Sequence, residues 1–214
     1  MSRCCARHGQ EQLFDDRFAR KSADRYRDKG PDAMARALAR RAAARGLDGT
    51  TVLEVGGGVG QVLLELVRQG ARSGEVVEVV PGYAEHTRAL ASEAGVADRV
   101  SSRVVDLVAD PAAGRPADIV VMNKVVCCTP DGPELAGIAA SLAERTLVVS
   151  FPRDVVWTRV FFGAINLGLR IGRRRFRTFV HAPAALRAAV EAHGLELASE
   201  RDGPLFRIAA FERA

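Results

Sequence analysis

Aromatic residues are scarce in this sequence, which has one tryptophan, two tyrosines and nine phenylalanines among 214 residues. Proteins that bind single-stranded nucleic acid stack bases on aromatic side chains along a basic groove. No basic stripe interleaved with aromatics occurs here, and the net charge of +5 is too small to indicate nucleic-acid binding by itself. Most basic residues are arginines scattered beside alanines, which we interpret as solvated helical faces. We therefore expect no nucleic-acid partner.

Cysteine is also sparse, and its spacing argues against the common zinc and redox motifs. The four cysteines form two adjacent pairs, Cys4-Cys5 and Cys127-Cys128, and neither pair has C-x-x-C spacing. A four-thiolate metal site would require the two pairs to meet in space, so we predict no metal site. We interpret Cys127 and Cys128 as buried packing residues, with a reactive or redox role as the alternative. With no apolar leader at the start of the sequence, we expect a cytoplasmic protein with reduced thiols.

One long apolar segment, VVWTRVFFGAINLGLRIG at 155–172, invites comparison with a membrane span. Its length, its glycines and the charge of Arg159 favour an amphipathic helix that covers the protein instead. The basic run RRRFR at 173–177 can also press such a helix onto an anionic bilayer. A peripheral membrane contact through this segment therefore stays open.

Strand-like and helix-like segments alternate after an N-terminal helical region. Residues 11–45 predict two amphipathic helices broken near Gly30-Pro31. Strands are predicted at 50–55, 74–80, 99–107, 117–125 and 145–151, with helices at 59–69, 83–95 and 133–144. Nearly continuous apolar strands that alternate with helices indicate a parallel sheet covered on both faces.

The chain length is consistent with one α/β domain. We divide it into an N-terminal helical cap (1–48), a core (49–152), an inserted cap (153–182) and a C-terminal part (183–214). The C-terminal part is predicted to contain a helix at 183–194 and a pair of strands at 195–203 and 204–213, as a hairpin at one sheet edge.

A glycine-rich loop joins the first predicted strand to the next helix, in the stretch VLEVGGGVGQ at 52–61. This is where a nucleotide-binding loop lies in such folds, because glycine lets the backbone approach a ligand and the helix start offers free N–H groups. The dinucleotide pattern G-x-G-x-x-G would require glycine at position 61, which is Gln61. The sequence instead reads E-x-G-x-G-x-G, through Glu54, Gly56, Gly58 and Gly60, with Gly57 between them.

This E-x-G-x-G-x-G loop resembles motif I of the class I S-adenosylmethionine-dependent methyltransferases. Three further segments are similar to bacterial relatives of magnesium-protoporphyrin O-methyltransferases, namely FDDRFARKSADRYRDKGPDA, VVMNKVVCCTPD and VVSFPRDVVWTRVFFGAINLGLRIGRRRFRTFVHAPAAL. The resemblance implies a Rossmann-like sheet of seven strands in the order 3-2-1-4-5-7-6, with strand 7 antiparallel, and a helical cap over the substrate. The fourth strand departs from that group, because it ends in Asn123-Lys124 where many relatives have an acid or histidine followed by arginine.

The cofactor implied is S-adenosyl-L-methionine, and its expected contacts lie at strand ends. The loop residues Glu54, Gly56, Gly57, Gly58 and Gly60 are expected to bind it. Glu78, with Val79 beside it, lies about twenty residues after the loop, where a carboxylate accepts from ribose hydroxyls. Asp106 matches the family position that faces the adenine amine, and Leu107 is expected to pack on the ring. Asn123 is expected to hold the methionine end.

Two residues are candidates for catalysis. Tyr26 on an N-terminal helix can close over the cofactor, and His181 after the insert can act as a base or substrate anchor. A structural histidine in a loop is an equal alternative for His181, and simple packing is the alternative for Tyr26.

The substrate-contact candidates lie in the insert and share apolar bulk or positive charge. An apolar pocket is expected from Trp157, Phe161 and Phe162, and an acidic substrate group can pair with Arg153, Arg175 or Arg177. Core packing or a solvated face is the alternative for each of them.

We therefore expect methyl transfer to a small apolar or aromatic molecule, at oxygen, in a setting such as natural-product biosynthesis. In-line transfer from a sulfonium chiefly requires alignment and exclusion of water. One alternative is a protein that binds the cofactor without transferring methyl. A nucleic-acid methyltransferase is less favoured, because the sequence lacks the N/D-P-P-Y/F tetrapeptide common in amino-methylating relatives.

Overall fold

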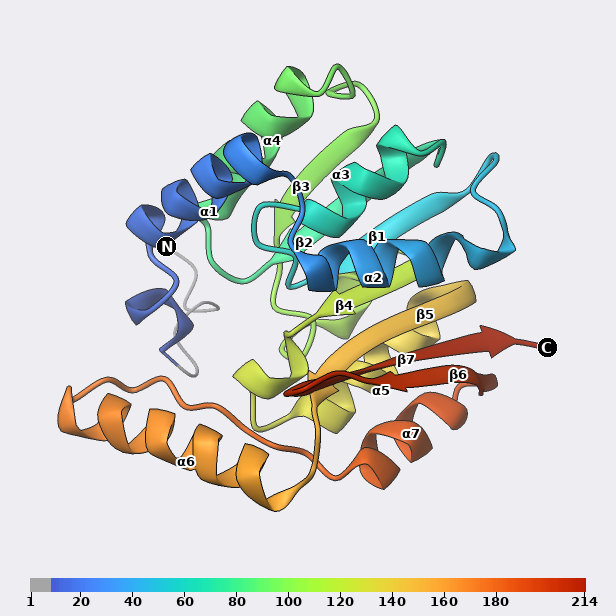
Figure 1. Ribbon diagram of the computed structural model, residues 1–214. Helices are drawn as coiled ribbons and strands as arrows, with labels where there is room; N and C mark the ends of the chain where they lie inside the picture. The colour runs from blue at the N-terminus through green and yellow to red at the C-terminus, as the bar shows by residue number, and fades with distance from the viewer. Residues whose placement is uncertain (1–8) are drawn as a thin grey trace.

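Seven strands form one sheet in the order β3-β2-β1-β4-β5-β7-β6 (Figure 1). The computed structural model describes residues 9–214. The strands are β1 (Thr51–Val55), β2 (Ser73–Glu78), β3 (Val100–Val104), β4 (Ala117–Asn123), β5 (Ala143–Pro152), β6 (Leu195–Asp202) and β7 (Phe206–Arg213). Strands β1 to β5 pair in parallel, whereas β7 pairs antiparallel with both β5 and β6. The strand order and the antiparallel seventh strand confirm the fold that the resemblance implied.

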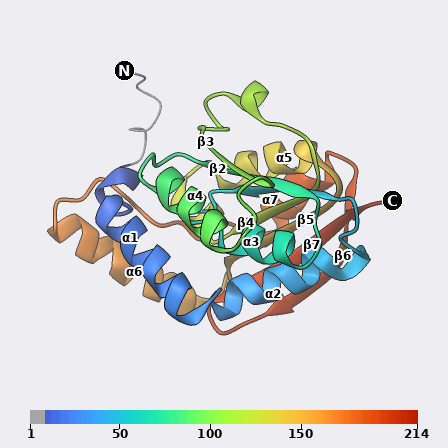
Figure 2. The same ribbon diagram turned by 90° about the horizontal axis from the view of Figure 1, so that it is seen from above.

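Helices lie on both faces of this sheet. The α-helices are α1 (Asp16–Lys29), α2 (Ala33–Ala42), α3 (Gln61–Arg68), α4 (Tyr83–Glu93), α5 (Gly132–Leu142), α6 (Val156–Ile171) and α7 (Pro183–Glu191). Short 3-10 helices are η2 (Gln10–Gln12), η3 (Ala43–Arg45), η4 (Pro111–Ala113) and η5 (Val126–Cys128). Seen from above, α2, α3 and α4 lie on one side of the sheet and α5 and α7 on the other (Figure 2).

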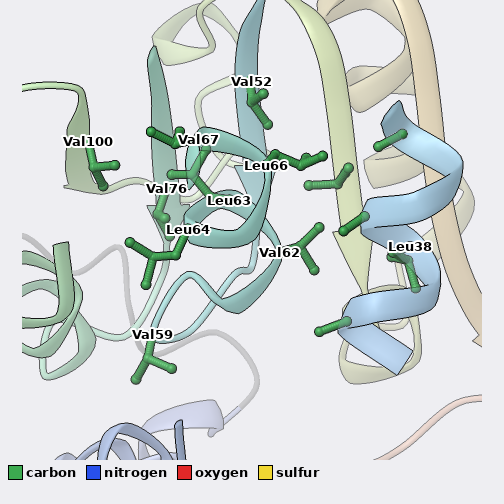
Figure 3. Packing of buried hydrophobic residues seen from close by; sticks show 14 of the residues in the cluster. Leu38, Val52, Val59, Val62, Leu63, Leu64, Leu66, Val67, Val76 and Val100 are labelled. Atoms are coloured by element: carbon green, nitrogen blue, oxygen red, sulfur yellow. The ribbon is translucent and has the colours of Figure 1, made fainter. Parts of the chain in front are cut away.

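The two faces follow from the alternation of side chains along each strand. In β1, Val52 packs into the cluster that α2, α3 and α4 cover, whereas Leu53 packs into the cluster beneath α5 and α7. Figure 3 shows the first cluster, in which Leu38 of α2 and Val62 of α3 converge on the sheet. Because β1 is buried on both faces, its apolar residues occupy consecutive positions rather than alternate ones.

Strand β3 ends earlier than the sequence suggested. The predicted strand ran to residue 107, but β3 stops at Val104. The cause is Asp106, whose Oδ1 accepts hydrogen bonds from the backbone N–H groups of Val108 (3.1 Å) and Ala109 (3.2 Å). Such side-chain bonds to nearby amides favour a turn over an extended strand. Asp106 and Leu107 therefore lie in a loop beyond the strand end.

Helix α6 lies at the periphery of the molecule in both views (Figures 1 and 2). Its buried residues are Thr158 and Phe162. The chain then returns as an extended segment, where Thr178 and Asn166 exchange hydrogen bonds of 2.8 Å through the side chain of Asn166. Among residues 9–214, no helix is both long and apolar enough to cross a membrane.

Gly74 of β2 packs against Leu63 of α3, and we predict that Gly74→Ala lowers the free energy of unfolding by about 1–3 kcal/mol. A Cβ atom there would overlap Leu63 Cδ1 and lie 2.7 Å from the carbonyl oxygen of Val52. Gly163→Ala in α6 is the matched control, because a Cβ there meets nothing within 4 Å. The control should be neutral or stabilising by up to about 1 kcal/mol. Chemical denaturation measures both, and equal effects would contradict this account of Gly74.

Candidate active site

The glycine loop turns the chain from the end of β1 into the start of α3. Gly56, Gly58 and Gly60 all have positive φ, at 63°, 55° and 77°. A Cβ atom on Gly56 would overlap the side chain of Val125, so this position needs glycine for space as well as for conformation. The N–H of Gly56 donates to the carbonyl oxygen of Val77 at 2.8 Å, which ties the loop to β2.

Glu54 lies on the buried side of this loop, next to α3. Its side chain is 1% exposed, and its Oε2 accepts a hydrogen bond of 2.8 Å from the N–H of Leu63 in α3. A Cβ atom on Gly57 would come within 2.7 Å of Glu54 Cγ, so the loop backbone rests directly on this side chain. Burial raises the pKa of Glu54 to about 8, although the amides of Leu63 and Val62 act in the opposite direction. The sequence predicted Glu54 as a cofactor contact, and the structure places it where it supports the loop.

Glu78 reaches the loop from the other side, at the end of β2. Its Oε2 accepts from the N–H of Gly58 at 3.0 Å, and its Oε1 accepts from the N–H groups of Val79 (2.8 Å) and Val80 (3.2 Å). The pKa of Glu78 is raised, because burial disfavours the charged carboxylate more than these three amides stabilise it. A carboxylate oxygen accepts about two hydrogen bonds, so Glu78 keeps acceptor capacity toward a ligand.

A cavity of about 240 Å³ opens at the carboxyl ends of β1, β2 and β4. In open parallel sheets this is where ligands bind. Seven of the residues predicted to bind the cofactor line it, namely Gly56, Gly58, Glu78, Val79, Asp106, Leu107 and Asn123. Glu54, Gly57 and Gly60 do not line the cavity. Gly57 instead packs against the Glu54 side chain.

Several lining residues were not identified from the sequence. Gln10 and Phe14 come from the N-terminal segment, and Tyr83 comes from the start of α4. The ring of Tyr83 packs on the loop, because a Cβ atom on Gly58 would lie 3.3 Å from Tyr83 Cε1. Its pKa is raised, first by burial and then by the charge of Glu78. The one sequence signal for Tyr83 is its place just after Pro81-Gly82, where the second strand meets a helix.

Asn123 and Lys124 line the cavity at the end of β4. The Oγ of Ser150 donates to Asn123 Oδ1 at 3.2 Å and accepts from the Lys124 N–H at 2.8 Å. Lys124 has a positive φ of 59°, and its Nζ lies 3.0 Å from Asp32 Oδ2 at the start of α2. Lys124 therefore links the end of β4 to the start of α2, whereas Asn123 is tied to β5 through Ser150.

The pair Cys127-Cys128 lies beside the cavity, with the two Sγ atoms 4.0 Å apart. Only Cys128 of this pair lines the cavity. Cys4 and Cys5 lie outside the described residues, so the predicted relation between the two pairs is untested. Across residues 9–214, no group of three or more His, Cys, Asp or Glu side chains is placed to hold a metal ion.

The two catalytic candidates do not reach the cavity. His181 Nε2 lies 2.9 Å from the carbonyl oxygen of Val126 and 3.0 Å from that of Thr129, so it donates to backbone acceptors. A Cβ on Gly132 would overlap the His181 ring, which packs beneath the start of α5. Tyr26 is 8% exposed and belongs to the core cluster of α1 to α4, where burial raises its pKa. Their placement corresponds to the structural alternatives weighed for both residues.

The substrate-contact candidates of the insert also lie away from the cavity. Trp157 is 47% exposed and Phe161 46% exposed on α6, whereas the ring of Phe162 turns inward to Phe206 at a centroid distance of 6.2 Å. Arg177 donates to the backbone carbonyl oxygen of Phe176, and Arg153 pairs with Asp202 at 3.3 Å. None of them lines the cavity that Glu78 and Gly58 form.

We predict that Glu54 makes the fold less stable as pH rises. Its native pKa of about 8 exceeds the usual carboxyl range, so the folded protein retains a proton that the unfolded chain releases. The free energy of unfolding should therefore fall between about pH 5 and about pH 8, by on the order of 3–5 kcal/mol from this group. Glu54→Gln should remove that part of the slope, whereas the exposed Glu196→Gln should not. Urea titrations across this window provide the measurement, and parallel profiles for wild type and Glu54→Gln would disprove the assignment.

Comparison with known proteins identifies this arrangement. A family model described as a methyltransferase domain matches residues 23–200. Magnesium protoporphyrin IX methyltransferase (ChlM) from Synechocystis PCC 6803, solved with bound SAH, is 21% identical with a TM-score of 0.70, and the match covers 95% of this chain and 99% of that chain. An O-methyltransferase family protein from Burkholderia thailandensis is 20% identical with a TM-score of 0.74, covering 97% and 63% of the two chains.

A third solved structure is that of a C-methyltransferase. Geranyl diphosphate C-methyltransferase from Streptomyces coelicolor A3(2), in complex with Mg²⁺, geranyl diphosphate and S-adenosyl-L-homocysteine, is 15% identical with a TM-score of 0.65, covering 85% of this chain and 78% of that chain. The search of curated proteins found no match. The family model spans most of the sequence and includes the glycine loop and the strand ends described above. The chain therefore belongs to the family of methyltransferase domains, whose members use S-adenosylmethionine as methyl donor.

Proposed function

We propose that this protein transfers a methyl group from S-adenosylmethionine to a small apolar or aromatic molecule, at an oxygen atom. The observation that carries the proposal is the cavity beside the glycine loop, whose walls join a buried carboxylate, Glu78, to apolar side chains such as Phe14 and Leu135. A concave, mostly apolar pocket with few polar groups suits a small molecule better than a polymer.

The residues present fit the cofactor. Gly56 and Gly58 expose backbone at positive φ, where a Cβ atom would overlap Val125 at Gly56 and lie in tight contact with Tyr83 at Gly58. Glu78 is a buried acceptor at the correct distance along the sequence for ribose hydroxyls. We assign Asp106 and Leu107 to the adenine and Asn123 to the methionine end, because all three line the same cavity.

When bound, the cofactor supplies a methyl group on a positively charged sulfur. The chain's own contribution is to align the acceptor and to exclude water, for which Phe14 and Tyr83 form apolar walls. His181 donates to two carbonyl oxygens, so we assign it to positioning the turn between η5 and α5 and not to proton transfer. An acceptor that ionises without help, such as an acidic phenol or a carboxylic acid, fits this set of residues.

The comparisons support the small-molecule part of this proposal more than the oxygen atom. The Burkholderia protein is an O-methyltransferase family protein, whereas the Streptomyces enzyme is a C-methyltransferase. We favour oxygen because carboxylic acids and acidic phenols need no base, and no histidine is among the described residues that line the cavity.

We predict that Glu78→Ala weakens the binding of S-adenosylhomocysteine by about tenfold or more, equal to about 1.4 kcal/mol, because the ribose loses its acceptor. Calorimetry should give micromolar-range binding for wild type and for the exposed control Glu196→Ala. Glu78→Gln retains an acceptor for the Gly58 N–H and serves to separate loss of ligand contact from loss of loop structure. Unchanged affinity in both Glu78 variants would mean that the ribose is placed wrongly.

We expect the wild-type protein to convert S-adenosylmethionine to S-adenosylhomocysteine in the presence of a phenolic or carboxylic acceptor, with the methyl group recovered on oxygen. Mass spectrometry of product and cofactor measures both halves of the reaction. Cofactor binding without turnover, across acceptors that include thiols, amines and activated carbons, would support the alternative that the cofactor is bound without methyl transfer.

A further inference from the structure

The outward side of helix α6 is an exposed apolar surface. The guanidinium of Arg153 lies 6.0 Å from the Trp157 ring, and Phe161 packs edge-on to Phe162, at one border of this surface. We define the α6 outer face as Val156, Trp157, Val160, Phe161, Leu167 and Ile171, which are exposed to between 46% and 78%. Of the nine large hydrophobic residues exposed in residues 9–214, seven lie on α6. The spacing 156, 160, 167 and 171 places four of them along one stripe of the helix.

This face is not the side by which α6 attaches to the protein. The attached side carries Thr158 and Phe162, with Phe162 packed against Phe206, and Asn166, which bonds to Thr178 on the returning segment. The helix is therefore held in a defined orientation by its inner side. Its apolar outer face is presented outward by the fold, and contiguous exposed apolar surface of this kind marks an interaction site.

Positive charge is concentrated next to the same face. Seven of the 31 basic residues and one of the 26 acidic residues of the chain lie at 153–182, so this segment carries +6 and the rest of the chain −1. Arg170, Arg173, Arg174, Arg175 and Arg177 lie at the C-terminal end of α6 and just beyond it. Within the part of the chain that the structure describes, Arg159 pairs with Asp154, whereas these five arginines have no carboxylate within ion-pair distance.

We propose that α6 and the arginines that follow it form a docking surface for an anionic lipid bilayer. The helix would lie in the plane of the membrane surface, with the α6 outer face among the acyl chains and the arginines at the lipid phosphates. An amphipathic helix with tryptophan and phenylalanine on one side and a basic end is the type of segment that binds in this way. At about 1.5 Å per residue, its 16 residues extend about 24 Å along such a surface.

Charge complementarity selects the bilayer over a second copy of the chain. Two copies that met through the α6 outer face would bring two segments of +6 near each other, which opposes association. A nucleic acid would neutralise the arginines but leave the apolar side chains in water. An anionic membrane satisfies the apolar face and the positive charge together, and the inference does not depend on which molecule is methylated.

The test is sedimentation of the full chain with vesicles of phosphatidylcholine, with and without phosphatidylglycerol. Wild type should bind the anionic vesicles about tenfold or more tightly than the neutral ones, because several arginines contribute. Trp157 is the single tryptophan of the sequence and belongs to the α6 outer face. Its fluorescence should shift to shorter wavelength on binding, which reports burial at this face directly.

Two double variants separate the apolar and the charged parts. Val160→Glu with Leu167→Glu places charge in the exposed stripe and should weaken vesicle binding by about tenfold or more. Its control is Ala185→Glu with Ala188→Glu, which adds the same charge to exposed positions of α7. Arg170→Gln with Arg175→Gln should also weaken vesicle binding by about tenfold. Its control is Arg187→Gln with Arg201→Gln, which removes the same charge away from this surface.

The controls should bind within about twofold of wild type. The proposal is overturned if wild type does not bind anionic vesicles, if its Trp157 emission does not move on binding, or if a control weakens binding as much as its matched variant. Sedimentation velocity without lipid examines the rival occupant. Self-association that Val160→Glu with Leu167→Glu abolishes would assign the face to a second copy and would likewise overturn the membrane assignment.

Discussion

Two buried carboxylates hold the glycine loop between them, and the site depends on this arrangement. Glu54 supports the loop from behind through the start of α3, and Glu78 accepts the Gly58 N–H from the front. Each carboxylate is buried, so each pays a desolvation cost that raises its pKa, and the charge of Glu78 adds to the shift at Glu54. Backbone N–H groups are what make such burial tolerable. The loop is therefore fixed before any ligand arrives, which lowers the cost of ordering the site on binding.

The sequence predicted those parts of the molecule that depend on local pattern. The alternation of apolar strands with helices identified the sheet. The order of the strands came from the resemblance. Glu78 and the glycines could be placed in the same way, since both lie within one βαβ unit. The strand that precedes Asp106 was predicted too long, because a side-chain turn that ends a strand leaves little trace in hydropathy.

The rest of the site could not be predicted, because it depends on how distant segments pack. Phe14 and Gln10 reach the cavity from the N-terminal segment, and nothing in their local sequence marks them as lining residues. For His181 a loop histidine suggested a base, but the two carbonyl oxygens that its ring meets belong to residues more than fifty positions away. A period of 3.6 in the insert predicted an amphipathic helix, yet it could not say whether the apolar side faces the protein or the solvent. Most basic residues lie elsewhere in the chain, as interpreted, and the basic run at 173–177 that the sequence marked follows this helix directly.

The basic segment packs against the N-terminal residues, and some of these line the cavity. Arg174 donates to the Gln12 carbonyl oxygen at 3.0 Å, and the Arg175 N–H donates to Gln12 Oε1 at 2.8 Å. Phe176 is buried against Phe14 with ring centroids 5.3 Å apart, and Phe14 is itself part of the cavity wall. A surface that held the arginines would thus lie one layer of side chains from this cavity. An apolar acceptor dissolved in a membrane would have a short path to that pocket, so the outward position of α6 and the apolar character of the cavity are consistent with each other.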